Sequence, residues 1–187
     1  MSDLKNVAAE YLKLKQELLN RMSAEGEAYV KELVTSIFDS APEISIIGWE
    51  AYAPYFNDGE PCEFSLHSVQ VHGVKIEKGP DESEDLESLI NDYVDFYGES
   101  SLASQYASDN GVSSTYNRST RKYDLSGPAL AIVTYERLKE IEFEVESMIY
   151  GSEDLLQMAL GDPHKVMAAR MPDGKIEISI GHDVEHD

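Results

Sequence analysis

The sequence holds a single cysteine, Cys62, so no disulfide can form within the chain. It has no apolar run approaching the ~20 residues of a membrane-spanning helix. Its first residues are polar and charged, and they do not resemble a signal peptide, in which an apolar stretch follows a basic start. These absences predict a soluble protein of the cytoplasm.

Basic residues are also scarce. Fifteen Lys and Arg stand against 36 Asp and Glu, which gives a formal net charge of -21 and an isoelectric point near 4.4. Nucleic-acid-binding proteins need basic residues to displace counterions, and an anionic membrane repels an acidic surface. The charge therefore disfavours both partners and favours cations or the basic surface of another protein. Acidity that only maintains solubility is the alternative.

The common signatures of enzymes are absent as well. There is no glycine-rich phosphate loop, no HExxH zinc motif, no pair of cysteines and no GxSxG nucleophile turn. A chain of 187 residues suffices for one domain with a sizeable core. We therefore expect a single domain over 1–187 that acts by binding rather than by catalysis and needs no cofactor.

The N-terminal segment 1–40 predicts a long helix. Apolar residues recur every three or four positions from Leu4 to Phe38, with charged residues between them. Gly26 interrupts this pattern and either breaks or weakens the helix. The narrow apolar stripe fits packing on the chain's own domain. It also fits a coiled-coil contact between copies, in which case residues 4–38 would assemble a structural homo-oligomer.

Two runs rich in β-branched and aromatic residues, at 44–53 and 62–76, predict a first hairpin. Along the second run the apolar residues change from even-numbered to odd-numbered positions. A strand can keep the same face buried across such a change only if it contains one extra residue. This change predicts a β-bulge near His67-Ser68.

Residues 81–99 contain eight acids and no base, yet their apolar residues keep helical spacing, which predicts an acidic helix. Residues 100–127 show no periodicity and are rich in Ser, Asn, Gly and Tyr. We therefore expect the segment 80–125 to be an acidic helix followed by a long, flexible insertion. The insertion carries a cluster of basic residues: Arg118, Arg121 and Lys122.

Two further helices are predicted in the last third of the sequence. Ser126 would cap the first, with Pro128 in its first turn, and Ser152 would cap a second that ends at Gly161. Together with two hairpins, this order of elements predicts an α+β fold. Its antiparallel sheet of about four strands would have helices packed on one face and a long N-terminal helix.

A candidate metal site follows from the second hairpin. If Pro172-Asp173-Gly174 forms its turn, Met171 pairs with Lys175, and the same register places two histidines opposite each other across the strands. Imidazoles and carboxylates are typical ligands of zinc, manganese and iron, so a small metal-binding protein or metal-dependent enzyme is an alternative function. The ligands of this divalent metal would be His164, His182, Asp162 and Asp183.

The acidic helices provide the preferred candidate surface. Spaced carboxylates on a helix can occupy a basic protein surface and can mimic the phosphates of DNA, although a charge run often marks only a solvated face. The candidate partner-binding residues are Asp81, Glu82, Glu84, Asp85, Glu87, Asp92, Asp95, Glu140 and Glu144.

The motif YFNDGEPCEF, residues 55–64, we interpret as the corner of the first hairpin. Asp58-Gly59 is a typical tight turn, and Cys62 fits a small buried hydrophobe with no basic neighbour in the sequence to activate it. The alternative, an acid/base pair of Glu60 and Glu63, requires the loop to fold back into a cleft.

Two stretches of the sequence resemble uncharacterised proteins of bacteriophage and bacterial genomes. The first is YAPYFNDGEPCEFSLHSV, with its aromatic-Asn-Asp-Gly-acid-Pro-Cys-acid-Phe motif. The second is LQMALGDPHKVMAAR, in which Pro163 separates the Asp and His of a Gly-Asp-His motif. The resemblance implies no established activity and no catalytic residue. It implies a phage-associated accessory protein in the host cytoplasm, of a class that often acts by binding host or defence proteins. Together with the acidic charge, this predicts that the protein engages a basic surface of such a protein, including a surface of the kind that binds nucleic acid.

Overall fold

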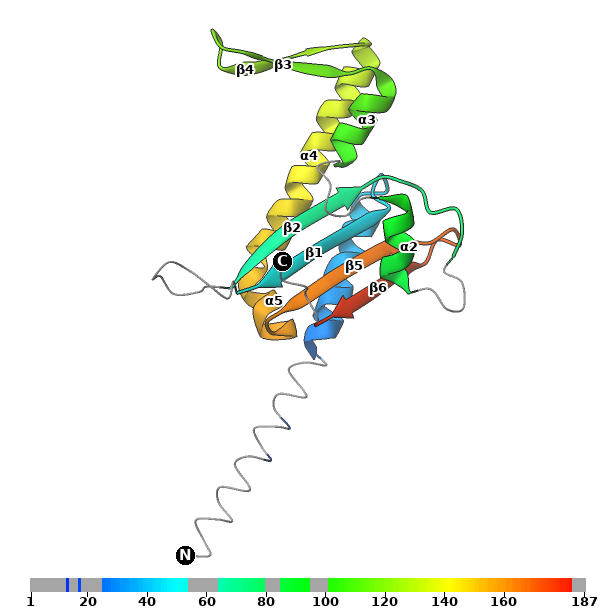
Figure 1. Cartoon of the computed structure of the whole chain (residues 1–187), viewed down its shortest axis with the longest axis vertical. Coiled ribbons are helices and arrows are strands. Elements are labelled where there is room, and N and C mark those ends of the chain that lie inside the picture. Colours follow the sequence, from blue (N-terminus) through cyan, green and yellow to red (C-terminus); the bar gives the residue numbers. More distant parts are fainter. Residues whose placement is uncertain are drawn as a thin grey trace, which may run out of the picture.

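The computed structural model describes residues 13, 17, 25–53, 64–79, 85–94 and 101–182 (Figure 1). Its main sheet has four antiparallel strands in the order β2-β1-β5-β6. The strands are β1 (Ile46–Tyr52), β2 (Ser65–His72), β5 (His164–Arg170) and β6 (Ile176–Gly181). The predicted α+β class and the sheet built from two hairpins are thus confirmed.

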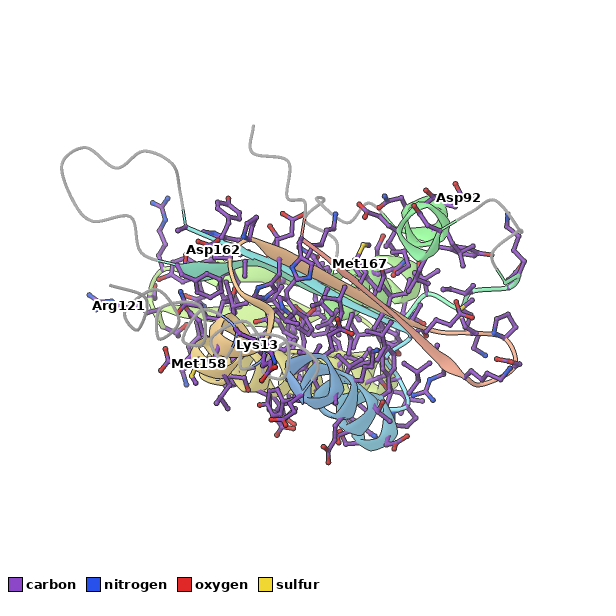
Figure 2. The ribbon with its side chains drawn as sticks, turned by 90° about the horizontal axis from the view of Figure 1, so that it is seen from below. Lys13, Asp92, Arg121, Met158, Asp162 and Met167 are labelled. Atoms are coloured by element: carbon purple, nitrogen blue, oxygen red, sulfur yellow. The ribbon has the colours of Figure 1, made fainter. Side chains whose placement is uncertain are left out.

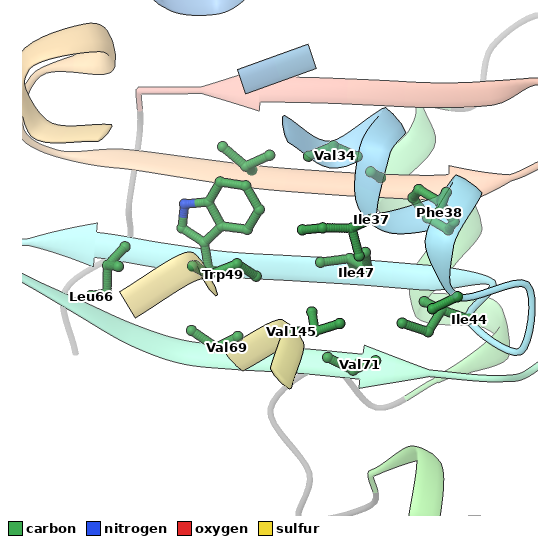
Figure 3. Packing of buried hydrophobic residues seen from close by; sticks show 14 of the residues in the cluster. Val34, Ile37, Phe38, Ile44, Ile47, Trp49, Leu66, Val69, Val71 and Val145 are labelled. Carbon is green, nitrogen blue, oxygen red and sulfur yellow. The ribbon is translucent and has the colours of Figure 1, made fainter. Parts of the chain in front are cut away.

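Three helices cover one face of this sheet: the N-terminal helix (25–40), α4 (Ala129–Gly151) and α5 (Glu153–Leu160). Trp49 of β1 is fully buried between the sheet and this helical layer (Figure 3). Apolar residues of all three helices pack around it in one core, among them Val34, Phe38, Val145, Ile149 and Leu156. Burying such side chains contributes ~1.5–3 kcal/mol each, so this layer dominates the stability of the fold.

The opposite face of the sheet carries the short helix α2 (Leu86–Tyr93). Side chains alternate across a strand, so Ile47 and Trp49 face the main core while Ile46 faces α2. Ile46 joins Leu89 and Ile90 of α2 in a second, smaller core. Figure 2 shows α2 and the helical layer on opposite sides of the sheet.

The predicted register and bulge are both present. Met171 N–H donates to Lys175 O over 2.7 Å, which closes the turn between β5 and β6 in the expected register. On β2, the pairing with β1 shifts near Ser68, which has a left-handed φ of 48°. The extra residue restores the apolar face of the strand after the change of parity.

The described part of the N-terminal helix packs on its own domain. Val30, Val34 and Phe38 have no exposed surface and belong to the main core. Gly26 is the second residue of this helix, and residues 18–24 before it lie outside the described part, so whether it breaks the predicted longer helix is not tested. The prediction of a homo-oligomer through 4–38 rests largely on residues outside the described part and stays a prediction.

The prediction of a long loop at 100–127 is wrong. Residues 101–126 form helix α3 (Leu102–Asn110) and a separate two-stranded hairpin, β3 (Ser113–Asn117) and β4 (Lys122–Ser126). We call this hairpin, residues 113–126, the arm. Polar and small residues dominate its strands, so no apolar alternation revealed them in the sequence.

The start of α4 also differs from the prediction. Ser126 belongs to β4, where its Oγ lies 2.7 Å from Ser113 Oγ, and the residue before the helix is Pro128, which makes no side-chain cap. From this start, α4 projects beyond the sheet with α3 packed alongside, and the arm lies at its far end (Figure 1). This projection creates the surface considered next.

Candidate functional site

A cleft of about 730 Å³ lies between the arm and α4. It carries aromatic rings, two carboxylates and one ammonium group. The lining residues are Ser114, Tyr123 and Leu125 of the arm and Tyr135, Glu136, Lys139 and Glu140 of α4.

The arm presents its tyrosines on one face because strand partners point the same way. Tyr116 pairs directly with Tyr123, and Ser114 pairs with Leu125. The two tyrosine rings lie 5.2 Å apart at 59°, a tilted arrangement that stabilises aromatic pairs. Tyr116 is 50% exposed and Tyr123 is 68% exposed, so this face retains most of its contact area for a partner.

On α4, the spacing of the sequence brings the cleft residues together. Tyr135 and Lys139 are one turn apart, as are Glu136 and Glu140, so each pair shares a side of the helix. Lys139 Nζ lies 5.7 Å from the centroid of the Tyr135 ring. This contact is a cation–π interaction between neighbouring turns of α4. Carboxylates and tyrosine faces together suit ammonium and guanidinium groups.

Two of the predicted partner-binding residues belong to this region. Glu140 lines the cleft, and Glu144 is exposed one turn further along α4. Glu142, between them, points inward and is buried against the start of α3. Burial raises its pKa, while Ser101 and the nearby backbone N–H groups of α3 favour its charged form. Glu140 and Glu144 are therefore exposed to solvent, whereas Glu142 between them belongs to the contact of α4 with α3.

The described acids of α2 mainly have partners within the chain. Asp85 accepts a hydrogen bond from Ser88 N–H over 2.8 Å, which caps α2 and lowers the pKa of this carboxyl. Glu87 Oε1 lies 2.7 Å from Lys165 Nζ, and Asp92 Oδ2 lies 4.0 Å from Lys78 Nζ. The remaining predicted residues lie outside the described residues: Asp81, Glu82, Glu84 and Asp95.

The acids of α2 and α4 do not form one surface. Asp92 of α2 and Met158 of α5, the helix that follows α4, lie on opposite sides of the sheet in Figure 2. A single partner surface cannot contact both acidic helices face to face. The cleft side of the molecule is the better candidate because there the carboxylates stand beside exposed aromatic rings.

The predicted metal site is assembled only in part. His164 is fully buried, its Nδ1 lies 2.7 Å from Gly161 O, and its Nε2 has no hydrogen-bond partner. Because a carbonyl only accepts, Nδ1 carries the proton. Burial lowers the pKa of His164, and nearby His182 lowers it further. Asp162 Oδ1 accepts from Ala53 N–H over 3.0 Å.

Asp183 and the motif residues 55–63 lie outside the described part of the chain, so neither the fourth metal ligand nor the predicted hairpin corner is tested. Within the described ranges, no group of three or more His, Cys, Asp or Glu side chains is arranged to hold a metal ion. The two histidines alone do not make a site.

A polar row on the α2 side of the sheet escaped sequence reasoning. Glu50 of β1 lies between His67 of β2 and Lys165 of β5. His67 Nε2 is 2.8 Å from Ser65 Oγ, and its ring stacks on Tyr52 at 4.2 Å. The available signal was a charge of opposite sign inside each of two largely apolar strands, Glu50 in IIGWEAY and Lys165 in HKVMAAR.

Among the helices that the structure describes, none is long and apolar enough to cross a bilayer. Comparisons of the chain with known protein families, with curated proteins and with solved structures find no match.

Proposed function

We propose that the protein is an acidic, non-enzymatic binding protein that receives basic side chains of a partner protein in the cleft between the arm and α4. One observation carries the proposal: Tyr123, Tyr135, Glu136 and Glu140 converge on a single cleft. Two rings and two carboxylates match what an arginine or lysine side chain needs, namely a π face for its cation and oxygen acceptors for its N–H groups.

The energetics favour a partner that brings several basic residues. A cation–π contact contributes ~0.5–1 kcal/mol when exposed and ~2 kcal/mol when water is excluded. A bidentate arginine–carboxylate pair adds geometric selectivity. The net charge of -21 attracts basic partners over a longer range, which raises the association rate and makes it sensitive to salt.

A regular row of carboxylates supports a partner surface of the kind that binds nucleic acid. Glu136, Glu140 and Glu144 are exposed at intervals of four residues, about 6 Å along the helix axis. Such a row presents evenly spaced negative charge, as a phosphate backbone does. The resemblance of two stretches of the sequence to phage and bacterial proteins supports a partner among host or defence proteins.

The test uses fluorescent peptides rich in arginine or lysine and measures their dissociation constants by anisotropy. Glu136→Gln/Glu140→Gln should weaken binding at least about tenfold, equivalent to ~1.4 kcal/mol, and Tyr135→Leu should weaken it without any change in charge. The matched control, Glu32→Gln/Glu177→Gln, removes the same charge from exposed positions elsewhere.

Equal weakening by the control would contradict the proposal, because binding would then follow net charge and not the cleft. Capture from nuclease-treated bacterial lysate with elution by a salt gradient then identifies the natural partner. The cleft variants should lose that partner and the control should keep it.

A further inference from the structure

The tip of the arm is a concentrated basic patch on an acidic protein. Arg118, Arg121 and Lys122 are all exposed, and no other five-residue window of the sequence contains three bases. The nearest acid, Asp124, accepts a hydrogen bond from Asn117 over 2.7 Å within the arm. Arg121 lies at the outer edge of the molecule in Figure 2.

The arm also lacks the support that most hairpins have. Its two strands of five residues are exposed at all but Asn117 and Leu125, and they pair with no strand of the main sheet. A two-stranded hairpin is at best marginally stable in water without packing against another element. A hairpin of this shape and exposure is typical of an element that packs against another molecule.

The opposite end of the helical layer has the complementary character. Residues 140–163 contain seven acids and no base. Large apolar side chains are exposed among them, at fractions of 42–70%, which is unusual for a surface that contacts only water. They are Phe143, Met148, Tyr150, Leu155 and Met158. We call the C-terminal part of this surface, around Glu144, Met148, Asp154, Leu155 and Met158, the acidic end.

The arm of one molecule cannot contact its own acidic end. Helix α4 has 23 residues and is about 35 Å long. The arm precedes its first turn and α5 follows its last turn, so the two patches lie at opposite ends of the helix (Figure 1). Any contact between them requires two copies of the chain.

We infer that the protein self-associates head to tail, with the arm tip of one copy bound to the acidic end of the next. The bases of the tip would pair with Glu144 and Asp154, and the apolar residues of the acidic end would cover the exposed tyrosines. Because the two patches differ, the contact is heterologous and propagates into a ring or a filament. Tyr123 also lines the cleft and Glu144 also belongs to the row of carboxylates described above, so self-association and partner binding would compete. The contact needs no partner protein, and it therefore stands if the proposed function fails.

The net charge of each copy opposes association at low ionic strength. At physiological salt the Debye length is ~8 Å, so repulsion between the distant parts of two copies is largely screened. Close, partly desolvated pairs at the contact are screened much less. Association should therefore be strongest at moderate salt and weaken at high salt.

The test is sedimentation of two charge-reversed variants of the full chain. One changes the tip, by Arg118→Glu/Arg121→Glu/Lys122→Glu, and the other changes the acidic end, by Glu144→Lys/Asp154→Lys. The wild type should form oligomers whose size grows with concentration, and each variant alone should be monomeric. An equimolar mixture should again form oligomers, because the intact tip meets the intact acidic end and the reversed, acidic tip meets the reversed, basic end.

The matched control, Lys31→Glu/Lys75→Glu/Lys175→Glu, reverses three exposed bases elsewhere and should assemble as the wild type does. A monomeric wild type, or oligomers that both variants retain, would overturn the inference. So would a monomeric wild type whose tip binds a fluorescent oligothymidylate, since the basic tip would then be a nucleic-acid contact. Circular dichroism of each variant verifies that it is folded.

Discussion

Lys165 and Lys175 show how differently the same kind of ion pair contributes in two surroundings. Lys165 Nζ lies 3.2 Å from Glu50 Oε1 and 2.7 Å from Glu87 Oε1, and its side chain is 9% exposed. Lys175 Nζ lies 2.8 Å from Asp173 Oδ2, but its side chain is 79% exposed. The two ion pairs therefore have similar N–O distances, although one is buried from water and the other is exposed to it.

Lys165→Met should lower the free energy of unfolding by ~3–5 kcal/mol, because it leaves the buried Glu50 carboxylate without its ammonium partner. Lys175→Met removes an exposed pair and should cost less than ~1 kcal/mol. Urea denaturation of the two variants measures both values. Similar losses would mean that the surroundings of Lys165 are wetter than its burial indicates.

Gly26 and Gly151 are both helical glycines, but one is packed closely against another helix and the other has open space beside it. A Cβ built on Gly26 would lie 2.4 Å from Ala159 O and 2.6 Å from Ala159 Cα, on the backbone of α5. A Cβ on Gly151, at the end of α4, would meet nothing within 4 Å. The N-terminal helix thus approaches α5 closely at Gly26, which explains a glycine in the middle of its apolar pattern.

Gly26→Ala should destabilise the protein by ~1–3 kcal/mol, because overpacking forces the two helices apart and outweighs the gain of ~1 kcal/mol in helix propensity. Gly151→Ala should be neutral or stabilising by up to ~1 kcal/mol, since only propensity changes. Thermal unfolding by circular dichroism compares the two. A stabilised Gly26→Ala would show that the helices separate at little cost.

How far an element could be predicted depended on where its order comes from. The bulge at Ser68 and the register at Met171 follow from local alternation and turn residues, so the sequence contained them. The arm could not be predicted from the sequence. Both faces of its strands are exposed, so the strands need no alternation of apolar and polar residues. The cleft was missed for a related reason: Tyr123 and Tyr135 come to line one cleft only through the packing of α3 on α4.

At the scale of the whole molecule, the sheet separates a helical layer from the α2 side, and a histidine is buried on each side. His72 is 1% exposed and His164 is fully buried, and the Nε2 of each has no hydrogen-bond partner. Burial lowers the pKa of both below the usual 6.5. Protonating either buried ring would place a charge where water cannot solvate it, which costs free energy. The two histidines should therefore stay neutral in the folded state at pH values at which they bind a proton in the unfolded chain.

The sign of the resulting pH dependence follows. Between the usual histidine pKa of 6.5 and the lower folded value, the unfolded chain binds more protons, so the free energy of unfolding falls as the pH falls through this window. Glu142 acts oppositely, because burial raises its pKa and the folded state gains stability as this group is protonated. Its contribution therefore opposes the loss from the histidines at lower pH.

Urea denaturation at about pH 7.5 and about pH 5.5, one unit on either side of the usual histidine pKa, measures this dependence. The wild type should lose ~1.4 kcal/mol for each pKa unit by which the folded state lowers a histidine within that interval. His164→Asn keeps a donor for Gly161 O but does not titrate, so its loss should be smaller, and His72→Asn/His164→Asn should lose least. Equal losses in all three proteins would mean that the buried rings gain partners on protonation and that carboxylates control the acid response.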